Sequence, residues 1–194
     1  MKLEGLLISW KHFEMLYEKD RGMPIPICPK IMKHHLELHN SSKMRVRLAV
    51  QIFSNSVAKG LRFYSSYREI EDSTAIADFC EWMNFMFDAL NRREYQNGLK
   101  VGNKDFLLLQ ESLNRLDQWE NLMEERIITT NEFLTRQTAE GLRVTLRSMI
   151  DITLYLTSKF NFSCIVRKHK SRCSRGVFHT GNQLYQKKDI IFVK

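Results

Sequence analysis

The sequence predicts a mainly α-helical protein with a short irregular or β-like basic tail at its C-terminus. Apolar residues recur at spacings of three and four through most of the chain before residue 160, as on the buried face of a helix. No segment in that range alternates with period two for long enough to predict a strand. Only FSCIV, from residue 162, and DIIFVK, from residue 189, are strand-like. With 194 residues and 43% hydrophobic content, the chain can bury a sizeable core.

The first helix is predicted from Trp10 to Lys19. Its apolar face consists of Trp10, Phe13, Leu16 and Tyr17. The helix must end before RGMPIPICPK, because three prolines and a glycine do not fit a regular helix. Pro29 suits the N-terminus of a helix, so a short second helix is expected after it.

The segment KMRVRLAVQIFSNSVAKGL, residues 43–61, is predicted to form one amphipathic helix. Its apolar stripe is Val46, Ala49, Val50, Phe53, Val57 and Leu61. The helix also carries many polar side chains, namely Lys43, Arg45 and Arg47 at its start and Gln51, Ser54, Asn55 and Ser56 along it. These polar side chains are either a solvated face or one wall of a site.

Three further helices are predicted before the tail. From Ser73 to Arg93 an apolar stripe of Ile76, Cys80, Met83, Phe87 and Leu90 runs beside a polar stripe of Glu81, Asn84, Asp88 and Asn91. After the break REYQNGLKVGNK, a long helix is marked by Phe106, Leu109, Leu113, Leu116, Trp119 and Met123. Thr129 and Glu132 form a capping-box pattern, and the last helix carries Leu142, Leu146, Met149, Ile150, Leu156 and Phe160.

The net charge of +8 belongs almost entirely to the tail. Residues 166–194 contain eight Lys or Arg and one acid, Asp189, so they carry +7 and leave about +1 for residues 1–165. Such a tail is either a solvated basic end or a segment that binds the phosphates of DNA. The predicted nucleic-acid contacts are Arg167, Lys168, Lys170, Arg172 and Arg175.

Targeting and metal signals are weak. No apolar run approaches 18 residues and no signal peptide is evident, so we expect a nuclear or cytoplasmic protein with no membrane partner. The four cysteines include no CxxC pair and are expected to be reduced thiols. His35 and His39 could share a helical face near Cys28 and His34, but that segment is short and has no second cysteine. The spacing Cys164/His169/Cys173/His179 matches no common zinc pattern closely, so no metal site is predicted.

Recognised catalytic motifs are missing from the sequence. It contains neither GxxxxGK[ST] nor GxGxxG, and no spacing suggests a Ser/His/Asp triad or a carboxylate trio for two metals. Asp88 and Asn91 share a helix face, and a carboxylate can accept both the ring N–H and the exocyclic amine of guanine. Taken alone, the pair is more typical of a solvated face.

Five short segments nevertheless occur in an order that is typical of one family: ISWKHFEMLYEKD, ICPKI, KMRVRLAVQIFSNSVAKGL, FMFDALNRR and GLRVTLRSMIDITLYLTSKFNF. From Ile8 to Phe162 the chain resembles the P-element type of transposase and the THAP-domain proteins descended from it. In that family a helical insertion that binds GTP without a P-loop interrupts an RNase H-like nuclease domain. The resemblance implies a GTP-binding insertion domain at 1–130, a helix returning to the RNase H-like domain at 131–165, and a degenerate basic tail at 166–194.

The resemblance also implies a nucleotide site for GTP, which magnesium can accompany. The positions that match nucleotide contacts of the family are Lys30, Arg45, Val46, Ser54, Phe87, Asp88 and Asn91. The family usually has lysine where Arg45 stands, so the positive charge is kept while its geometry changes.

Departures from the family predict that the chain is not an enzyme. No segment matches the zinc-coordinating THAP domain or the first two catalytic aspartates, and Cys173 and Gly176 stand where two later acids are expected. The sequence thus predicts a truncated, catalytically inactive transposase-like protein that binds guanine nucleotide and associates with DNA through its tail, with its oligomeric state left open. The alternative is a helical protein-interaction module that binds no nucleotide.

Overall fold

The computed structural model describes residues 2–3, 6–39, 42, 45–67, 70, 72–167, 184–187 and 190–193. The chain divides into two compact units. The first unit contains residues 1–85 and 119–135, and the second contains residues 86–118 and 136–194. The mainly helical fold class is confirmed, while the division into the three segments 1–130, 131–165 and 166–194 stays a prediction.

The first unit begins with a small hairpin that the sequence did not predict. Strand β1 (Lys2–Leu3) pairs antiparallel with β2 (Leu6–Leu7). Period-two patterning cannot reveal two-residue strands, because they are too short to alternate.

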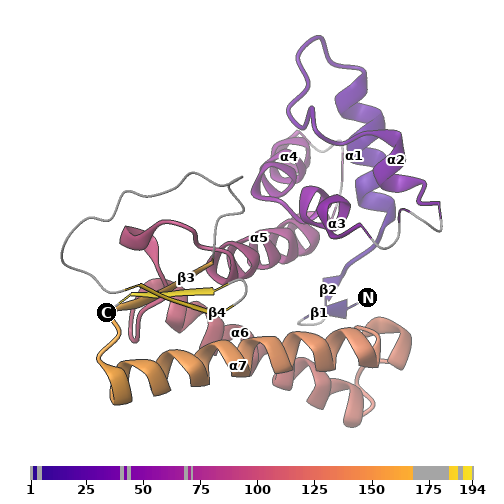
Figure 1. The fold of residues 1–194 in the computed structure, drawn as a ribbon. Coiled ribbons are helices and arrows are strands. Elements are labelled where there is room, and N and C mark those ends of the chain that lie inside the picture. Colours follow the sequence, from indigo (N-terminus) through magenta and orange to yellow (C-terminus); the bar gives the residue numbers. More distant parts are fainter. Residues whose placement is uncertain are drawn as a thin grey trace. The chain divides into compact units, whose positions relative to one another are not determined.

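Helices make up the rest of the first unit (Figure 1). They are α1 (Lys11–Arg21), α2 (Lys33–Leu36), α3 (Val46–Ile52), α4 (Asn55–Ser66) and the first part of α5 (Thr74–Leu90). Helix α1 packs on α2 and α4, and α2 packs on α3. The last part of α6 (Lys104–Glu124) and the 3-10 turn η2 (Thr130–Glu132) also belong to this unit.

An aromatic and aliphatic core holds these helices together. Phe13 and Leu16 of α1 and Leu61 and Tyr64 of α4 are almost completely buried. A chain of edge-to-face ring contacts continues through Phe13, Phe53, Phe79, Trp119 and Phe133. Burial of several aromatic rings supplies much of the stabilisation of a unit of this size.

The single helix predicted over residues 43–61 is wrong, because the chain breaks at Phe53 and Ser54. Ser54 has an extended backbone (φ −115°, ψ 155°) and is the N-cap of α4. The first residue of α4, Asn55, donates its backbone N–H to the Asn84 side chain at 3.1 Å. The predicted stripe therefore holds only in α4, where Val57 and Leu61 are buried, whereas Val46 in α3 is 68% exposed.

The other predicted helix positions can be compared directly with the structure. The first helix is confirmed within two residues at its C-terminal end. The short helix expected after Pro29 is confirmed as α2, but Pro29 is not in its first turn. Pro29 lies in a turn closed by the bond from the Ile31 N–H to the Cys28 carbonyl (3.0 Å), and α2 begins after Met32. The Thr129/Glu132 capping box is present, but it caps η2, and the last helix starts only at Arg136.

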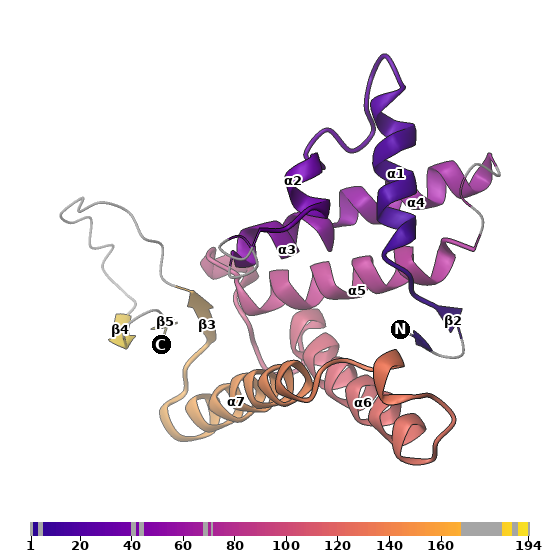
Figure 2. The same cartoon turned by 90° about the vertical axis from the view of Figure 1, so that its right-hand side faces the viewer.

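The second unit contains the end of α5, the 3-10 turn η1 (Tyr95–Asn97), most of α6, α7 (Arg136–Phe160) and a small sheet (Figure 2). The sheet has the antiparallel order β3-β5-β4, with β3 at Cys164–Arg167, β4 at Leu184–Lys187 and β5 at Ile190–Val193. Both strand-like segments of the sequence are thereby confirmed. Strand β4 was not predicted, because LYQK lacks the apolar character of the other two.

Ion pairs connect segments of the second unit that are distant in the sequence. Arg92 donates two hydrogen bonds to the Asp105 carboxylate, from Nε at 2.6 Å and from Nη2 at 3.1 Å. Arg143 of α7 donates from Nε to Asp117 of α6 at 2.8 Å. The bond to Asp105 raises the pKa of Arg92 above its ordinary value. None of the described helices combines the length and apolar character needed to cross a bilayer.

Candidate functional site

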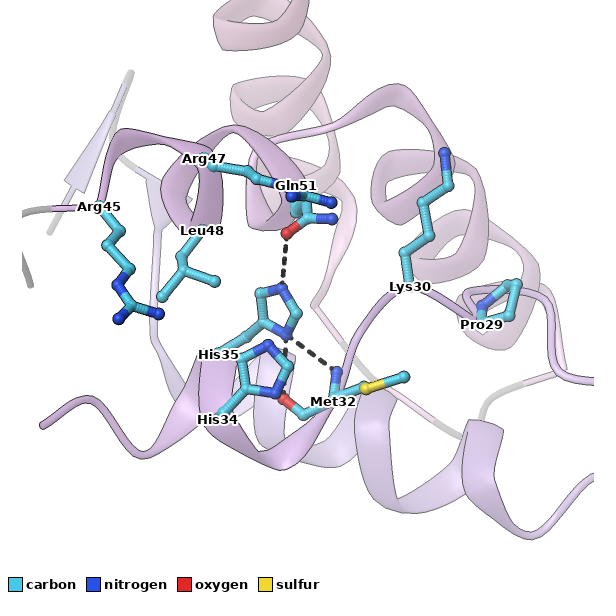
Figure 3. Close-up of a pocket in the computed structure, with 9 residues that line it drawn as sticks. All are labelled: Pro29, Lys30, Met32, His34, His35, Arg45, Arg47, Leu48 and Gln51. Atoms are coloured by element: carbon cyan, nitrogen blue, oxygen red, sulfur yellow. Dashed lines mark hydrogen bonds between the residues drawn. The ribbon is translucent and has the colours of Figure 1, made fainter. Parts of the chain in front are cut away.

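The first unit contains a pocket of about 540 Å³ formed by α2, α3 and the turn before α2 (Figure 3). Its lining residues are Pro29, Lys30, Met32, His34, His35, Arg45, Arg47, Leu48 and Gln51. Arg45 and Leu48 approach from one side and Lys30 and Pro29 from the other, with His34, His35 and Met32 between them. The pocket thus brings together side chains from two parts of the sequence, residues 29–35 and 45–51.

The lining of this pocket is strongly basic. Lys30, Arg45 and Arg47 are exposed, and none of the described residues that line the pocket is acidic. Clustered cations around a concave surface raise the local concentration of anions. The chemistry of the lining therefore favours a ligand with several negative charges, such as a chain of phosphates.

A buried histidine orders one wall of the pocket. His35 is only 3% exposed, and its Nε2 lies 2.9 Å from Oε1 of Gln51. Its Nδ1 lies 3.1 Å from the backbone nitrogen of Met32, an N–H that can only donate, and 3.2 Å from the Met32 carbonyl oxygen. That carbonyl already accepts the backbone N–H of His35 at 2.9 Å, so it needs no bond from the ring, whereas the Met32 N–H needs an acceptor. Nδ1 must therefore accept, so Nε2 carries the proton and donates to Gln51. The orientation of the ring is fixed from both sides.

A buried carboxylate fixes the loop that carries Lys30. Asp20, 5% exposed at the end of α1, accepts the backbone N–H groups of Ile27 at 2.7 Å and Cys28 at 2.8 Å. It also accepts the hydroxyl of Tyr64 at 3.0 Å. Three donors on one carboxylate compensate for its burial and anchor the loop immediately before the pocket.

Cys28 lies next to Asp20, and its thiol is expected to be a poor nucleophile. Burial, reinforced by the negative charge of Asp20, raises the pKa of the Cys28 thiol to about 12. Cys28, Cys80 and Cys164 are free and buried in the structure, and their reduced state stays a prediction. Cys173 lies outside the described residues.

The predicted nucleotide contacts of the first unit fall into two groups. Lys30 and Arg45 line the pocket, and Arg45 also precedes α3 as its N-cap. Val46 and Ser54 are not among the lining residues: Val46 is exposed at the start of α3, and Ser54 is half-buried before α4.

The other predicted contacts belong to the second unit, at the C-terminal end of α5. Asp88 is exposed and Phe87 is half-buried. Asn91 follows the last residue of α5, donates its side-chain amide to the Phe87 carbonyl at 2.6 Å, and donates its backbone N–H to the Asp88 carbonyl at 3.0 Å. Asn91 thus lies just past the end of α5 with its amide bonded back to the helix, and the shared face predicted for Asp88 and Asn91 stays a prediction.

Sequence reasoning missed the role of His35 in the pocket and left Gln51 undecided. His34 and His35 were weighed only as metal ligands, and the described part of the chain holds no cluster of three or more His, Cys, Asp or Glu residues that could bind a metal. Gln51 and Arg47 were part of the polar excess on the 43–61 segment. That excess was the available signal, because a helix that only packs on a core has no need of it.

The tail positions mostly cannot be compared with the structure. Arg167 is the last residue of β3, while Lys168, Lys170, Arg172 and Arg175 lie outside the described residues. The same holds for Gly176 and for His169 and His179 of the weak zinc pattern.

Comparison with known proteins gives three matches. Residues 1–102 match the family described as TNP-like, GTP-binding insertion domain. The chain is 30% identical over 167 residues to the transposable element P transposase of Drosophila melanogaster, an alignment covering 78% of this chain and 22% of that protein. It therefore spans about a fifth of that relative's length.

The third match is to a solved structure, the Drosophila P element transposase strand transfer complex. The TM-score is 0.64 at 24% identity, covering 84% of this chain and 37% of the other. This likeness supports the mainly helical fold.

Proposed function

Because the chain belongs to the family of TNP-like GTP-binding insertion domains, we propose that it binds GTP in preference to ATP and is a catalytically inactive, P-element transposase-like protein. The observation that carries the proposal is the basic pocket of the first unit. The pocket supplies positive charge for phosphates. The chain has no P-loop, so a bound nucleotide needs such charge from another part of the protein.

The phosphates of the nucleotide are proposed to lie against Lys30 and Arg45. Lysine offers a flexible point charge, whereas the planar guanidinium of Arg45 can bind two phosphate oxygens at once. Val46 and Ser54 are proposed as further nucleotide contacts on the strength of the family resemblance alone. A magnesium ion can accompany the phosphates, as it commonly does with nucleoside triphosphates.

For the second unit, considered by itself, we propose that Asp88 and Asn91 recognise guanine. The Asp88 carboxylate can accept the ring N–H and the exocyclic amine of guanine, a pattern that adenine does not present. Phe87 is proposed to contact the base, although its half-buried position makes it partly a packing residue. The Asp88 side chain is exposed, so a ligand can reach it in the folded protein.

Catalytic inactivity is proposed from the residues that stand in place of carboxylates. Two-metal phosphoryl transfer needs several acids around one metal pair. The family resemblance puts Cys173 and Gly176 at two positions where acids are expected. Purified protein with Mg²⁺ or Mn²⁺ should neither nick nor join DNA. Reproducible cleavage that copurifies with the protein would contradict this part of the proposal.

DNA association is proposed for the tail. Arg167, Lys168, Lys170, Arg172 and Arg175 would release counterions from a duplex, so the slope of log K against log salt should be about −4 to −5 if about five phosphates are neutralised. Deletion of residues 166–194 should abolish this binding. Undiminished binding by the shortened protein would place the DNA contact elsewhere. A nuclear location would agree with such a role.

A titration of the purified protein with fluorescent GTP, competed by unlabelled GTP and ATP, tests the main proposal. We expect displacement by GTP at lower concentration than by ATP. A folded protein that binds neither nucleotide at millimolar concentration would favour a helical protein-interaction module. That second candidate draws support from α7, where Val144, Leu154, Tyr155 and Phe160 are between 43% and 64% exposed.

A further inference from the structure

We propose that the side-chain amide of Gln51 is a fixed hydrogen-bond donor for the phosphate chain, held in that role by His35. Neither residue is among the contacts expected from the sequence. The inference rests on the proposed function, since the anion concerned is the phosphate chain of the nucleotide. It assigns to the pocket a third binding group beside Lys30 and Arg45.

His35 fixes the orientation of the Gln51 amide. The Met32 N–H can only donate to Nδ1 of His35, and the Met32 carbonyl, 3.2 Å from the same atom, already accepts the backbone N–H of His35. The proton of the ring is therefore on Nε2 and points at Gln51, 2.9 Å away. Only an acceptor can face that proton, so the amide presents Oε1 to His35 and cannot be reversed without opposing two donors. Its NH2 group consequently points away from His35 (Figure 3).

The arrangement of His35 and Gln51 is also rigid. The Met32 carbonyl already accepts the backbone N–H of His35 at 2.9 Å, so the ring is held by the first turn of α2. His35 is buried, and the ring of His34 lies against it with the centroids 4.1 Å apart. A side chain held this firmly loses little rotamer entropy when a ligand binds, which improves affinity.

The Gln51 NH2 group is suited to bind a phosphate oxygen. Gln51 lines the same pocket as Lys30, Arg45 and Arg47, so its NH2 group is part of a surface whose other polar groups are largely cationic. An amide N–H bound to a phosphate oxygen forms a charge-assisted hydrogen bond. Loss of one such bond corresponds to roughly tenfold or more in affinity.

Gln51→Glu is the sharpest test, because it preserves the shape and the acceptor for His35 while replacing the NH2 group with a negative oxygen. The probe is inorganic tripolyphosphate, measured by calorimetry, beside GTP and guanosine. We expect tripolyphosphate and GTP to bind at least tenfold more weakly to the variant, with guanosine unchanged. Gln110→Glu, an exposed glutamine on α6, is the matched control and should change none of the three.

His35 acts through Gln51 and is a positioning residue, which a double-mutant cycle can test. His35→Asn should weaken tripolyphosphate binding severalfold, and the double variant His35→Asn, Gln51→Leu should bind no more weakly than Gln51→Leu alone. Additive losses, or equal losses for guanosine and tripolyphosphate, would mean that the pair only supports the fold.

The outcomes also separate this inference from the proposed function. If GTP is not preferred over ATP but tripolyphosphate binds and is lost in Gln51→Glu, the guanine proposal fails and the donor role of Gln51 stands. If GTP binds equally well to Gln51→Glu and the unchanged protein, the donor role is overturned. Absence of tripolyphosphate binding at millimolar concentration would overturn it as well.

Discussion

Gly60 of α4 and Cys28 of the loop before α2 lie in direct contact, so close that a Cβ atom on Gly60 would come within 2.5 Å of the Cys28 sulfur. The absence of a side chain at Gly60 lets the loop press onto α4. The same loop carries Lys30 two residues later, so this contact helps to set the edge of the basic pocket.

Gly60→Ala should therefore destabilise the protein, although alanine is the better helix former. The gain in helix propensity is about 1 kcal/mol, whereas forcing a methyl group against a buried sulfur costs about 1–3 kcal/mol. We expect a lower urea midpoint, measured by circular dichroism. Gly141→Ala in α7 is the control, because no atom lies within 4 Å of its added Cβ and the variant should be slightly stabilised.

The double variant Gly60→Ala, Cys28→Ala checks the cause. Removing the sulfur creates the space that the methyl group needs, so the double variant should be more stable than the sum of the two single changes predicts. Strict additivity would show that the Gly60 effect does not arise from this contact.

Asp20→Ala should destabilise the protein strongly, because it leaves the buried Cys28 N–H, the half-buried Ile27 N–H and the Tyr64 hydroxyl without their acceptor. Such losses typically total about 2–4 kcal/mol, while Tyr64→Phe removes one donor and should cost about 1 kcal/mol. Chemical denaturation measures both. Asp151→Ala, an exposed change on α7, should stay within about 0.5 kcal/mol. A mild effect of Asp20→Ala would mean that water replaces the carboxylate.

The helices could be predicted from the sequence where one apolar stripe continues, as in α5 and α6. The prediction failed at Phe53 and Ser54 because the stripe continues across the break. What ends α3 there is the extended Ser54 and the bond from Asn55 to Asn84, 29 residues away. A contact between distant segments leaves no periodic signal in the sequence.

The candidate site was only partly predictable for a similar reason. Lys30 and Arg45 came from the family resemblance, and both line the pocket. The pairing of His35 with Gln51 joins residues on different helices, and the tautomer of the ring depends on a backbone N–H three residues away. Neither relationship can be read from residue types alone.

The buried thiols should resist alkylation in the folded protein. Burial raises the pKa of both Cys28 and Cys80 to about 12 and raises that of Cys164 as well, so at pH 8 almost no thiolate is present. In a Cys173→Ser background, iodoacetamide should label the native protein slowly and all three remaining cysteines after denaturation. Rapid labelling of the native protein would reveal local opening around one of the three.

Acid should weaken the link between α4 and α5. The hydrogen bond from Arg62, at 2.7 Å, lowers the pKa of Glu81, so the pair stabilises the fold fully above the ordinary glutamate pKa of 4.5 and loses this effect as pH falls through the lowered value. Because the Arg62 side chain is 39% exposed, solvent screening limits the contribution to about 0.2–1 kcal/mol.

The measurement is the urea midpoint of Glu81→Gln and the unchanged protein from pH 7 to pH 3. The variant should be less stable at pH 7, and the difference should shrink below pH 4.5. Glu125→Gln, an exposed residue after α6, is the control and should show no such convergence. A difference that is constant with pH would exclude an ionic origin.

Asp88→Asn should reverse the base preference. The new amide places a donor opposite the donors of guanine, so GTP affinity should fall by about 1–3 kcal/mol. Xanthine carries a carbonyl where guanine carries its amine, and that carbonyl can accept the new amide N–H, so XTP should bind the variant better than GTP does. Because Asp88 is exposed, the substitution should leave the fold intact, which circular dichroism can verify. Asp151→Asn on α7 is the matched control. If Asp88→Asn bound GTP, ATP and XTP with the same ranking as the unchanged protein, Asp88 would not be the residue that reads the base.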